Sequence, residues 1–266
     1  MENNQLISLE GLNALICGST SGMGRAAAHE FASSGASVTL FARNEKKLKE
    51  TLASLDNSLK QNHTYIIGDF NEPDHIKKII HEHINDKNIY HILINNSGGP
   101  KGGPISDADT SEFIKSFNRH LICNHVITQA LLEGMRSFNY GRIINIISTS
   151  VKQPIEGLGV SNTIRGAVAS WSKTLSFEVA RHGITVNNLL PGFTDTDRLS
   201  SLIQARAKTN NKSEEAIVDA MKDQIPIGRF AKPEEIAKVL AFLASPAAGY
   251  INGVNLAVDG GRLSCM

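Results

Sequence analysis

The chain has 266 residues, of which 41% are apolar and 20% are charged, the proportions of an ordinary globular protein. Its 27 Lys and Arg residues nearly balance its 26 Asp and Glu residues, so no basic excess points to nucleic acid or to an acidic membrane surface. The length fits one large domain over residues 1–266, and no apolar run approaches the roughly 20 residues that a membrane-spanning helix needs.

Cysteine spacing and the first residues bear on the compartment. Cys17, Cys123 and Cys265 lie far apart and form no Cys-x-x-Cys or other metal-ligand spacing. Residues 1–5 do not begin a cationic segment followed by an apolar one, as a secretory signal would. We therefore expect reduced thiols, no metal site and a cytoplasmic protein.

Short apolar segments alternate with helical segments along most of the chain. The predicted strands are 12–17, 37–42, 65–67, 92–94, 142–147 and 185–190, with a last one near Val258. The predicted helices are 25–34, 44–59, 73–85, 110–136 and 161–181. Such alternation favours parallel pairing through right-handed crossovers, and apolar runs such as 143–147 suit strands covered on both faces. The sequence therefore predicts a Rossmann-type, doubly wound α/β domain with a mostly parallel sheet of seven strands flanked by helices.

A glycine-rich turn connects the first predicted strand to the first predicted helix. Backbone N–H groups and the helix dipole at such a turn attract phosphate, and glycines allow a pyrophosphate to approach closely. The spacing Gly-x-x-x-Gly-x-Gly differs from Gly-x-Gly-x-x-Gly, so the position between strand and helix carries most of the argument. The residues predicted to bind a dinucleotide here are Gly18, Ser19, Ser21, Gly22, Met23 and Gly24.

The end of the second predicted strand bears on which dinucleotide binds. An acidic residue there would accept hydrogen bonds from the ribose of NAD, whereas an arginine pairs with the 2′-phosphate of NADP. The chain reads Phe41-Ala42-Arg43-Asn44, without an acid. Arg43, assisted by Ser19, therefore favours NADP(H) over NAD(H); a solvated surface arginine is the alternative.

Residues 194–224 follow the sixth predicted strand and are polar, rich in Ser, Asn, Lys and Ala. Ligands of open α/β sheets bind at the carboxyl ends of the strands. We interpret this stretch as a mobile helical lid over a substrate, with a plain surface insertion as the alternative.

Taken together, these motifs resemble the short-chain dehydrogenase/reductase family over nearly the whole chain, and the C-terminal part resembles its 3-oxoacyl-acyl-carrier-protein reductases. The resemblance rests on the glycine turn, Asp69, Asn95-Asn96-Ser97-Gly98, Asn145-Ile146-Ile147-Ser148, Pro191-Gly192, Ile225-Pro226-Ile227-Gly228-Arg229-Phe230 and Val258-Asp259-Gly260-Gly261. It implies hydride transfer between a nicotinamide and a carbonyl or alcohol carbon, and a homotetramer or homodimer. It adds Asp69, Asn95, Ser97, Gly98, Arg165, Pro191, Gly192 and Thr194 to the cofactor-binding residues.

The family's catalytic residues map onto a departure from its pattern. Its substrate-binding Ser falls on Ser148, its Tyr-x-x-x-Lys motif falls on Ser161 and Arg165, and its Asn falls on His120. The resemblance thus implies a catalytic set of Ser148, Ser161, Arg165 and His120. An aliphatic hydroxyl is a much weaker acid than a phenol, whose pKa is near 10, and arginine releases a proton poorly. His120 is a candidate substitute for the proton donor, with packing on a helix surface as the alternative.

Three functions remain open at this point. The first is an NADP(H)-dependent oxidoreductase acting on a carbonyl or secondary alcohol through an atypical proton relay. The second is a catalytically impaired or inactive nucleotide-binding homologue that serves as sensor or scaffold. The third is a lyase or isomerase with His120 as base. A small-molecule substrate is expected in the first and third, and neither nucleic acid nor membrane in any.

Overall fold

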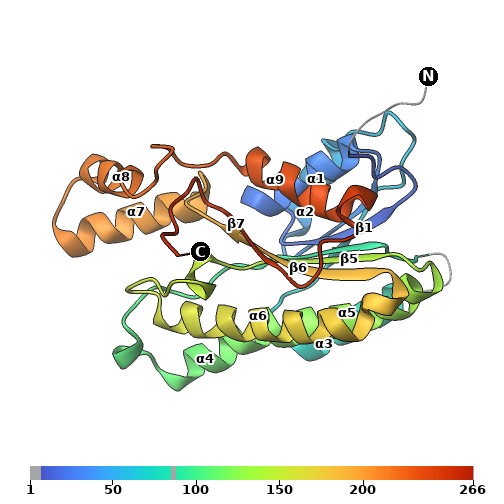
Figure 1. Cartoon of the computed structure of the whole chain (residues 1–266), viewed down its shortest axis with the longest axis horizontal. Coiled ribbons are helices and arrows are strands. Elements are labelled where there is room, and N and C mark those ends of the chain that lie inside the picture. Colours follow the sequence, from blue (N-terminus) through green and yellow to red (C-terminus); the bar gives the residue numbers. More distant parts are fainter. Residues whose placement is uncertain (1–6, 85–87, 266) are drawn as a thin grey trace.

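The computed structural model describes residues 7–84 and 88–265, and these form a central sheet with helices on both faces (Figure 1). Within these residues seven strands pair in the order β3-β2-β1-β4-β5-β6-β7, and every pair is parallel. The strands are β1 Asn13–Cys17, β2 Ser37–Ala42, β3 Thr64–Ile67, β4 Ile92–Asn95, β5 Gly141–Ile146, β6 Ile184–Pro191 and β7 Asn255–Val258. The predicted single-domain, Rossmann-type fold is confirmed, and the sheet is parallel throughout.

The strand order reverses between β1 and β4. From β1 the chain adds β2 and then β3 on one side, and β4 starts the other side. The connections that leave β1 and β4 run to opposite sides and therefore leave a crevice beyond the carboxyl ends of these two strands. Ligands of doubly wound sheets bind at this position. All residues of β4 and β5 are buried, as their continuous apolar sequences predict.

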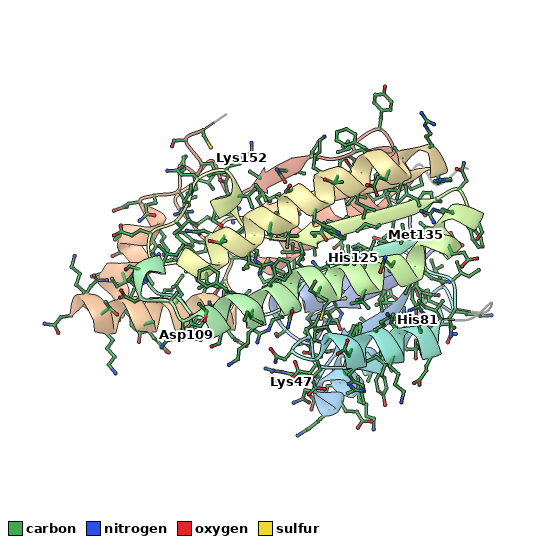
Figure 2. All side chains as sticks on the ribbon, turned by 90° about the horizontal axis from the view of Figure 1, so that it is seen from below. Lys47, His81, Asp109, His125, Met135 and Lys152 are labelled. Atoms are coloured by element: carbon green, nitrogen blue, oxygen red, sulfur yellow. The ribbon has the colours of Figure 1, made fainter. Side chains whose placement is uncertain are left out.

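Helices cover the two faces in separate layers. On one face lie α1 Gly22–Ser33, α2 Glu45–Ala53 and α9 Pro233–Ala244, and on the other lie α3 Pro73–His83, α4 Thr110–Phe117, α5 Cys123–Ser137 and α6 Gly159–Val179 (Figure 1). Each layer has its own apolar cluster, the first around Phe31 and Leu40 and the second around Ile127 and Ile143. Figure 2 shows α5 and α6 side by side, with His125 on α5 accepting a hydrogen bond of 3.3 Å from the indole of Trp171 on α6.

Several predicted helices have different ends in the structure. The helix predicted over 44–59 ends at Ala53, and the chain then turns, reaching a left-handed backbone at Lys60 (φ 58°). The helix predicted over 73–85 ends at His83, and its last predicted residue lies outside the described residues. The helix predicted over 161–181 begins two residues earlier, at Gly159.

The single helix predicted over 110–136 is interrupted. A π-helical turn, Asn118–Ile122, separates α4 from α5. Such a turn accommodates one additional residue within a continuous helix, so the apolar periodicity of the sequence does not reveal it. It contains His120 and so determines where this predicted site residue lies.

A row of asparagines crosses four neighbouring strands. Asn95, Asn145, Asn188 and Asn255 occupy the same register of β4, β5, β6 and β7. Each side-chain amide donates to the next, at 2.9, 2.9 and 2.8 Å, and the first three residues are buried. Most of these amide groups therefore have a partner inside the sheet, where a lone buried amide would be costly, and the Oδ1 of Asn95 is the exception.

Residues 194–224 contain two helices, α7 Asp197–Asn210 and α8 Glu214–Lys222, which extend beyond the end of the sheet (Figure 1). They pack around a small apolar cluster of their own, made of Leu199, Ile203, Ala207, Ile217 and Met221. The side chains of Thr196 and Ser213 cap the two helices. The helical character of this stretch agrees with the sequence, and its action as a lid stays a prediction.

Neither a membrane-spanning helix nor a metal-binding cluster is found in the described part of the chain. No helix in residues 7–84 and 88–265 is long and apolar enough to cross a membrane. In the same residues, no group of three or more His, Cys, Asp or Glu side chains is arranged to hold a metal ion.

Candidate cofactor and substrate site

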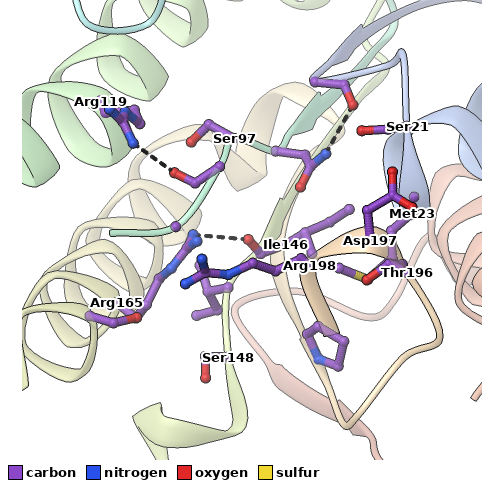
Figure 3. Close-up of a pocket in the computed structure, with 18 of the residues that line it drawn as sticks. Ser21, Met23, Ser97, Arg119, Ile146, Ser148, Arg165, Thr196, Asp197 and Arg198 are labelled. Atoms are coloured by element: carbon purple, nitrogen blue, oxygen red, sulfur yellow. Dashed lines mark hydrogen bonds between the residues drawn. The ribbon is translucent and has the colours of Figure 1, made fainter. Parts of the chain in front are cut away.

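A cleft of about 520 Å³ lies at the carboxyl ends of the central strands (Figure 3). It brings together many of the residues that the sequence singles out, from the glycine turn to the start of α6. Of these, its lining includes Gly18, Ser21, Gly22, Met23, Arg43, Asp69, Ser97, Gly98, Ser148, Ser161, Arg165, Pro191 and Gly192.

The glycine turn is packed too tightly for side chains. A Cβ on Gly24 would lie 2.2 Å from the carbonyl oxygen of Gly18, and one on Gly18 would lie 2.8 Å from the Asn96 side chain. Gly18 and Gly22 also adopt left-handed backbones, with φ of 61° and 50°. Because α1 begins at Gly22, the first backbone N–H groups of this helix have no acceptor within the helix. This end of the cleft is therefore suited to a pyrophosphate.

Four predicted cofactor residues lie behind the lining of the cleft. Ser19 is fully buried, and its hydroxyl accepts a 3.0 Å hydrogen bond from the N–H of Phe41, which ties the turn to β2. Gly24 lies under the turn, and the Asn95 amide belongs to the asparagine row. Thr194 is buried and donates to the carbonyl of Gly192 at 3.2 Å. Ser19 and Thr194 thus bond the surrounding backbone, and none of the four residues belongs to the lining of the cleft.

Arg43 and Asp69 lie at the rim near the end of β2. Their charged groups are 3.8 Å apart, and the two side chains are 75% and 36% exposed. An ion pair this exposed is weak, since water and salt screen it. Arg43 is therefore free to turn towards a phosphate group in the cleft.

His120 lies one layer behind the cleft. It is only 1% exposed, and its Nδ1 is 2.7 Å from the hydroxyl of Ser97, which does line the cleft. Its Nε2 is buried without a partner among the described residues. Burial lowers its pKa well below the usual value, and the positive charges of Arg165 and Arg119 lower it further. The ring is therefore neutral near pH 7 and reaches the cleft only through Ser97.

Arg165 and the two serines form the other end of the cleft. Arg165 is buried in α6, and its Nη1 donates to the carbonyl of Ile146 at 3.1 Å. Burial lowers its pKa to about 10, with a further contribution from Arg198. Ser161 lies one helical turn before it, so both side chains point to the same side of α6. The hydroxyl oxygen of Ser148 accepts from the N–H of Ser150 at 3.1 Å, which leaves its proton available to a ligand.

The structure adds residues that were not among the predicted site residues. Arg198, in the first turn of α7, donates to the carbonyl of Pro100 at 2.8 Å, and Arg119 donates to the carbonyl of Gly98 at 3.1 Å. Asn71, Asn96 and Arg262 also line the cleft. The position of Arg198 could have indicated it. A cation in the first turn of a helix interacts unfavourably with the helix dipole, so an arginine there points to a contact outside the helix.

Two other kinds of side chain are not part of this cleft. Lys101 and Lys152 are exposed and do not belong to its lining. No tyrosine lines it within the part of the chain that the structure describes. Tyr140, for example, donates to the carbonyl of Ala244 at 2.7 Å instead.

Comparisons with known proteins agree with this geometry. The family described as enoyl-(acyl carrier protein) reductase matches residues 18–262. The chain belongs to the short-chain dehydrogenase/reductase family. It is 34% identical to the 3-oxoacyl-(acyl-carrier-protein) reductase FabG of Rickettsia prowazekii over 97% of this chain and 99% of that protein. The predicted family and the similarity to 3-oxoacyl-acyl-carrier-protein reductases are thereby confirmed.

Solved structures of this short-chain dehydrogenase/reductase family superpose over nearly the whole chain. L-sorbose reductase from Gluconobacter frateurii, complexed with NADPH and L-sorbose, has a TM-score of 0.91 and 29% identity, covering 98% of this chain and 100% of that one. Actinorhodin polyketide ketoreductase with NADPH has a TM-score of 0.88 and 28% identity, covering 96% and 98%. Both neighbours were solved with NADPH, in line with the cofactor that Arg43 favours.

Proposed function

We propose that the protein is an NADP(H)-dependent oxidoreductase that interconverts a carbonyl and a secondary alcohol. The observation that carries this proposal is one continuous cleft that joins the glycine turn to Ser148, Ser161 and Arg165. A nucleotide-binding protein without a reaction would not need hydroxyl groups and a buried cation at the far end of its cofactor cleft.

In this proposal the glycine turn and the first N–H groups of α1 hold the pyrophosphate, and Arg43 pairs with the 2′-phosphate. Pro191 and Gly192 line the same cleft and would flank the cofactor. The NADPH complexes of the two structural neighbours support this choice of cofactor. When bound, NADP(H) supplies or accepts the hydride.

The side chains of the chain itself bind and polarise the substrate. Ser148 and Ser161 donate hydrogen bonds to the carbonyl oxygen, and the positive charge of Arg165 stabilises the negative charge that develops there. Neither serine is an efficient proton donor, and His120 is neutral near pH 7 because burial lowers its pKa. Water that reaches the cleft therefore delivers the proton. Positioning accounts for most of the catalysis, and the loss of a general acid lowers the rate by about 10²–10⁴-fold.

The relatives support a carbonyl substrate without fixing its identity. Their names specify a 3-oxoacyl group on acyl carrier protein, L-sorbose and a polyketide. These molecules share a ketone and differ in size and charge. The reaction type is therefore the part that the proposal transfers to this chain.

Two measurements on the purified protein test the proposal. The first is a fluorescence titration with NADPH and, in parallel, NADH; we expect NADPH to bind more tightly. The second follows deuterium from labelled NADPH into the products of a panel of ketones. We expect transfer that falls at least about tenfold in Ser148→Ala and rises in the double variant Ser161→Tyr with Arg165→Lys, because a phenol beside a lysine restores a proton donor.

Ser170→Ala is the matched control, since Ser170 lies exposed on α6, the helix of Ser161, outside the cleft. It should leave both measurements unchanged. NADPH binding without deuterium transfer, in the wild type and in the restored double variant alike, would overturn the oxidoreductase and favour a nucleotide-binding homologue. Absence of binding to either nucleotide would reject both.

A further inference from the structure

Two arginines approach the same point in the cleft from different elements. A Cβ placed on Gly99 would lie 3.9 Å from the Nη2 atom of Arg198 and 4.0 Å from the Nη2 atom of Arg165. Arg165 comes from α6 and Arg198 from the first turn of α7, and Figure 3 shows their guanidinium groups next to each other. Because Gly99 has no side chain, the volume beside both groups is open to a ligand.

Neither arginine has an acidic partner among the described residues. Each donates to one backbone carbonyl, Arg165 to Ile146 and Arg198 to Pro100. The ion pairs formed within residues 7–84 and 88–265 do not include either of them. Asp197 also lines the cleft, but it lies towards Met23 and Thr196, away from Arg165 (Figure 3).

Two neighbouring cations without a counter-charge are unfavourable when one of them is buried. The lowered pKa of Arg165, caused by burial and then by Arg198, reflects this. Guanidinium groups present several N–H donors in a plane. The Nη2 of Arg165 faces the volume beside Gly99, and so does the Nη2 of Arg198, which donates one of its two hydrogens to Pro100. An anionic oxygen group there would be attracted by both charges and accept hydrogen bonds from both.

We infer that Arg198 and Arg165 together bind an anionic group of the substrate, a carboxylate or a phosphate, so that this enzyme acts on acidic carbonyl compounds. The inference rests on the proposed function, because it deepens the description of the same site. The cofactor's own phosphates do not account for the pair. They are expected at Gly22, Met23 and Arg43, and Figure 3 places Met23 on the opposite side of the cleft from Arg165.

Arg198 also connects the two walls of the cleft. It belongs to the predicted lid and donates a hydrogen bond to the carbonyl of Pro100, in the loop that follows β4. An anion bound beside Gly99 adds a second link between α7 and that loop. A substrate's charge would then favour the closed arrangement of the helices that cover it.

The test uses the full-length protein saturated with NADP⁺, so that the cofactor's phosphate positions are filled and no reduction occurs. Calorimetric titrations compare acetoacetate, its neutral methyl ester and inorganic phosphate. We expect at least one of the two anions to bind roughly 10- to 100-fold more tightly than the ester, and Arg198→Gln to remove that preference. Arg198→Lys should retain part of it, because it keeps the charge and loses the planar donors.

Two further variants separate the pair from general electrostatics. Gly99→Ala adds a methyl group at ordinary contact distance from both arginines, so it should fold normally and weaken anion binding without changing charge. Lys208→Gln removes one exposed charge from the same helix and should change nothing. Preferential binding of phosphate or of acetoacetate identifies which anion the substrate carries, and either result supports the inference.

Equal binding of acetoacetate, phosphate and ester would overturn the inference, as would an equal loss of anion binding in Arg198→Gln and Lys208→Gln. These results leave NADPH binding and deuterium transfer untouched. Failure of the NADPH titration instead rejects the proposed function. In that case the same anion titrations without nucleotide still report on the arginine pair.

Discussion

The two ends of the cleft are built in different ways. At the glycine turn, main-chain atoms pack directly against one another, and a Cβ on Gly24 would lie 2.2 Å from the carbonyl oxygen of Gly18. At the other end, side chains of Ser148, Ser161, Arg165 and Arg198 define the surface. The first end tolerates almost no change, whereas the second can change one residue at a time while the fold stays the same. A chain can therefore keep the family's nucleotide turn and present a different set of reactive groups.

The largest effect expected is at the backbone-built end. Gly24→Ala forces the turn apart, because no flexible side chain can move away from the new methyl group. We expect a loss of about 3 kcal/mol in the free energy of unfolding and a fall of NADPH affinity by about 100-fold. Chemical denaturation and the fluorescence titration measure these two quantities.

Gly166→Ala provides the control for this change. Gly166 lies inside α6, and a Cβ there meets nothing within 4 Å. Alanine should therefore stabilise the helix by about 1 kcal/mol and leave NADPH affinity unchanged. If Gly24→Ala bound NADPH as tightly as Gly166→Ala, the tight packing of the turn would not be what shapes the nucleotide end.

The next prediction concerns Arg43, the one cationic side chain assigned to the nucleotide end. Arg43→Gln should weaken NADPH by about 10- to 100-fold, because it removes a charge-assisted hydrogen bond to the 2′-phosphate. NADH lacks that phosphate, so its affinity should change less than about twofold. Titrations with both nucleotides test this, with the exposed Arg25→Gln on α1 as the matched loss of charge. A parallel loss of NADH binding would contradict the role of Arg43.

The smallest effect expected is the contribution of His120 to the pH dependence of the protein's stability. Its pKa is lowered in the folded protein, so the unfolded chain, with a pKa near 6.5, binds a proton first as the pH falls. Stability is therefore complete above about pH 6.5 and declines below it, with a slope of at most about 1.4 kcal/mol per pH unit for one group. Burial is the main cause of the lowered pKa of His120, and the positive charges of Arg165 and Arg119 add to it.

His120→Asn should make the protein less sensitive to acid. Melting temperatures of the wild type and the variant should differ in slope between pH 7 and pH 5. The lowered pKa values of His29, His83 and His91 remain in both proteins, so only the difference in slope is assigned to residue 120. His182→Asn, at an exposed histidine, is the control. Identical slopes in all three proteins would mean that His120 is as easily protonated in the fold as in the unfolded chain.

The sequence anticipates the backbone-built end well. Short, mainly apolar runs of three to six residues identify the strands, and glycines at positions 18, 22 and 24 mark where the chain approaches itself. These features are local, since each depends on residues a few positions apart. The same locality explains the confirmed fold class, because the alternation of strands and helices allows few other arrangements.

The side-chain-built end is anticipated less completely. Arg198 and Arg165 are 33 positions apart in the sequence and approach each other only when α7 folds against the loop at Gly99. The buried contact of Ser19 with Phe41 and the π-helical turn at His120 likewise depend on packing that no local pattern encodes. The catalytic positions implied by the family resemblance located the cleft, but they did not predict that Arg165 and Arg198 lie next to each other in it.

The row of asparagines across β4, β5, β6 and β7 has a consequence for how the chain folds. Side chains alternate between the two faces of a strand, so a slip of one residue between β4 and β5 would move an asparagine to the opposite face. Its amide would then be buried among apolar groups without a partner, at a cost of several kcal/mol. The apolar residues beside these asparagines would otherwise allow misaligned pairings of similar energy. The amides penalise those alternatives, and the carboxyl ends of the strands that carry the cleft are thereby brought level with one another.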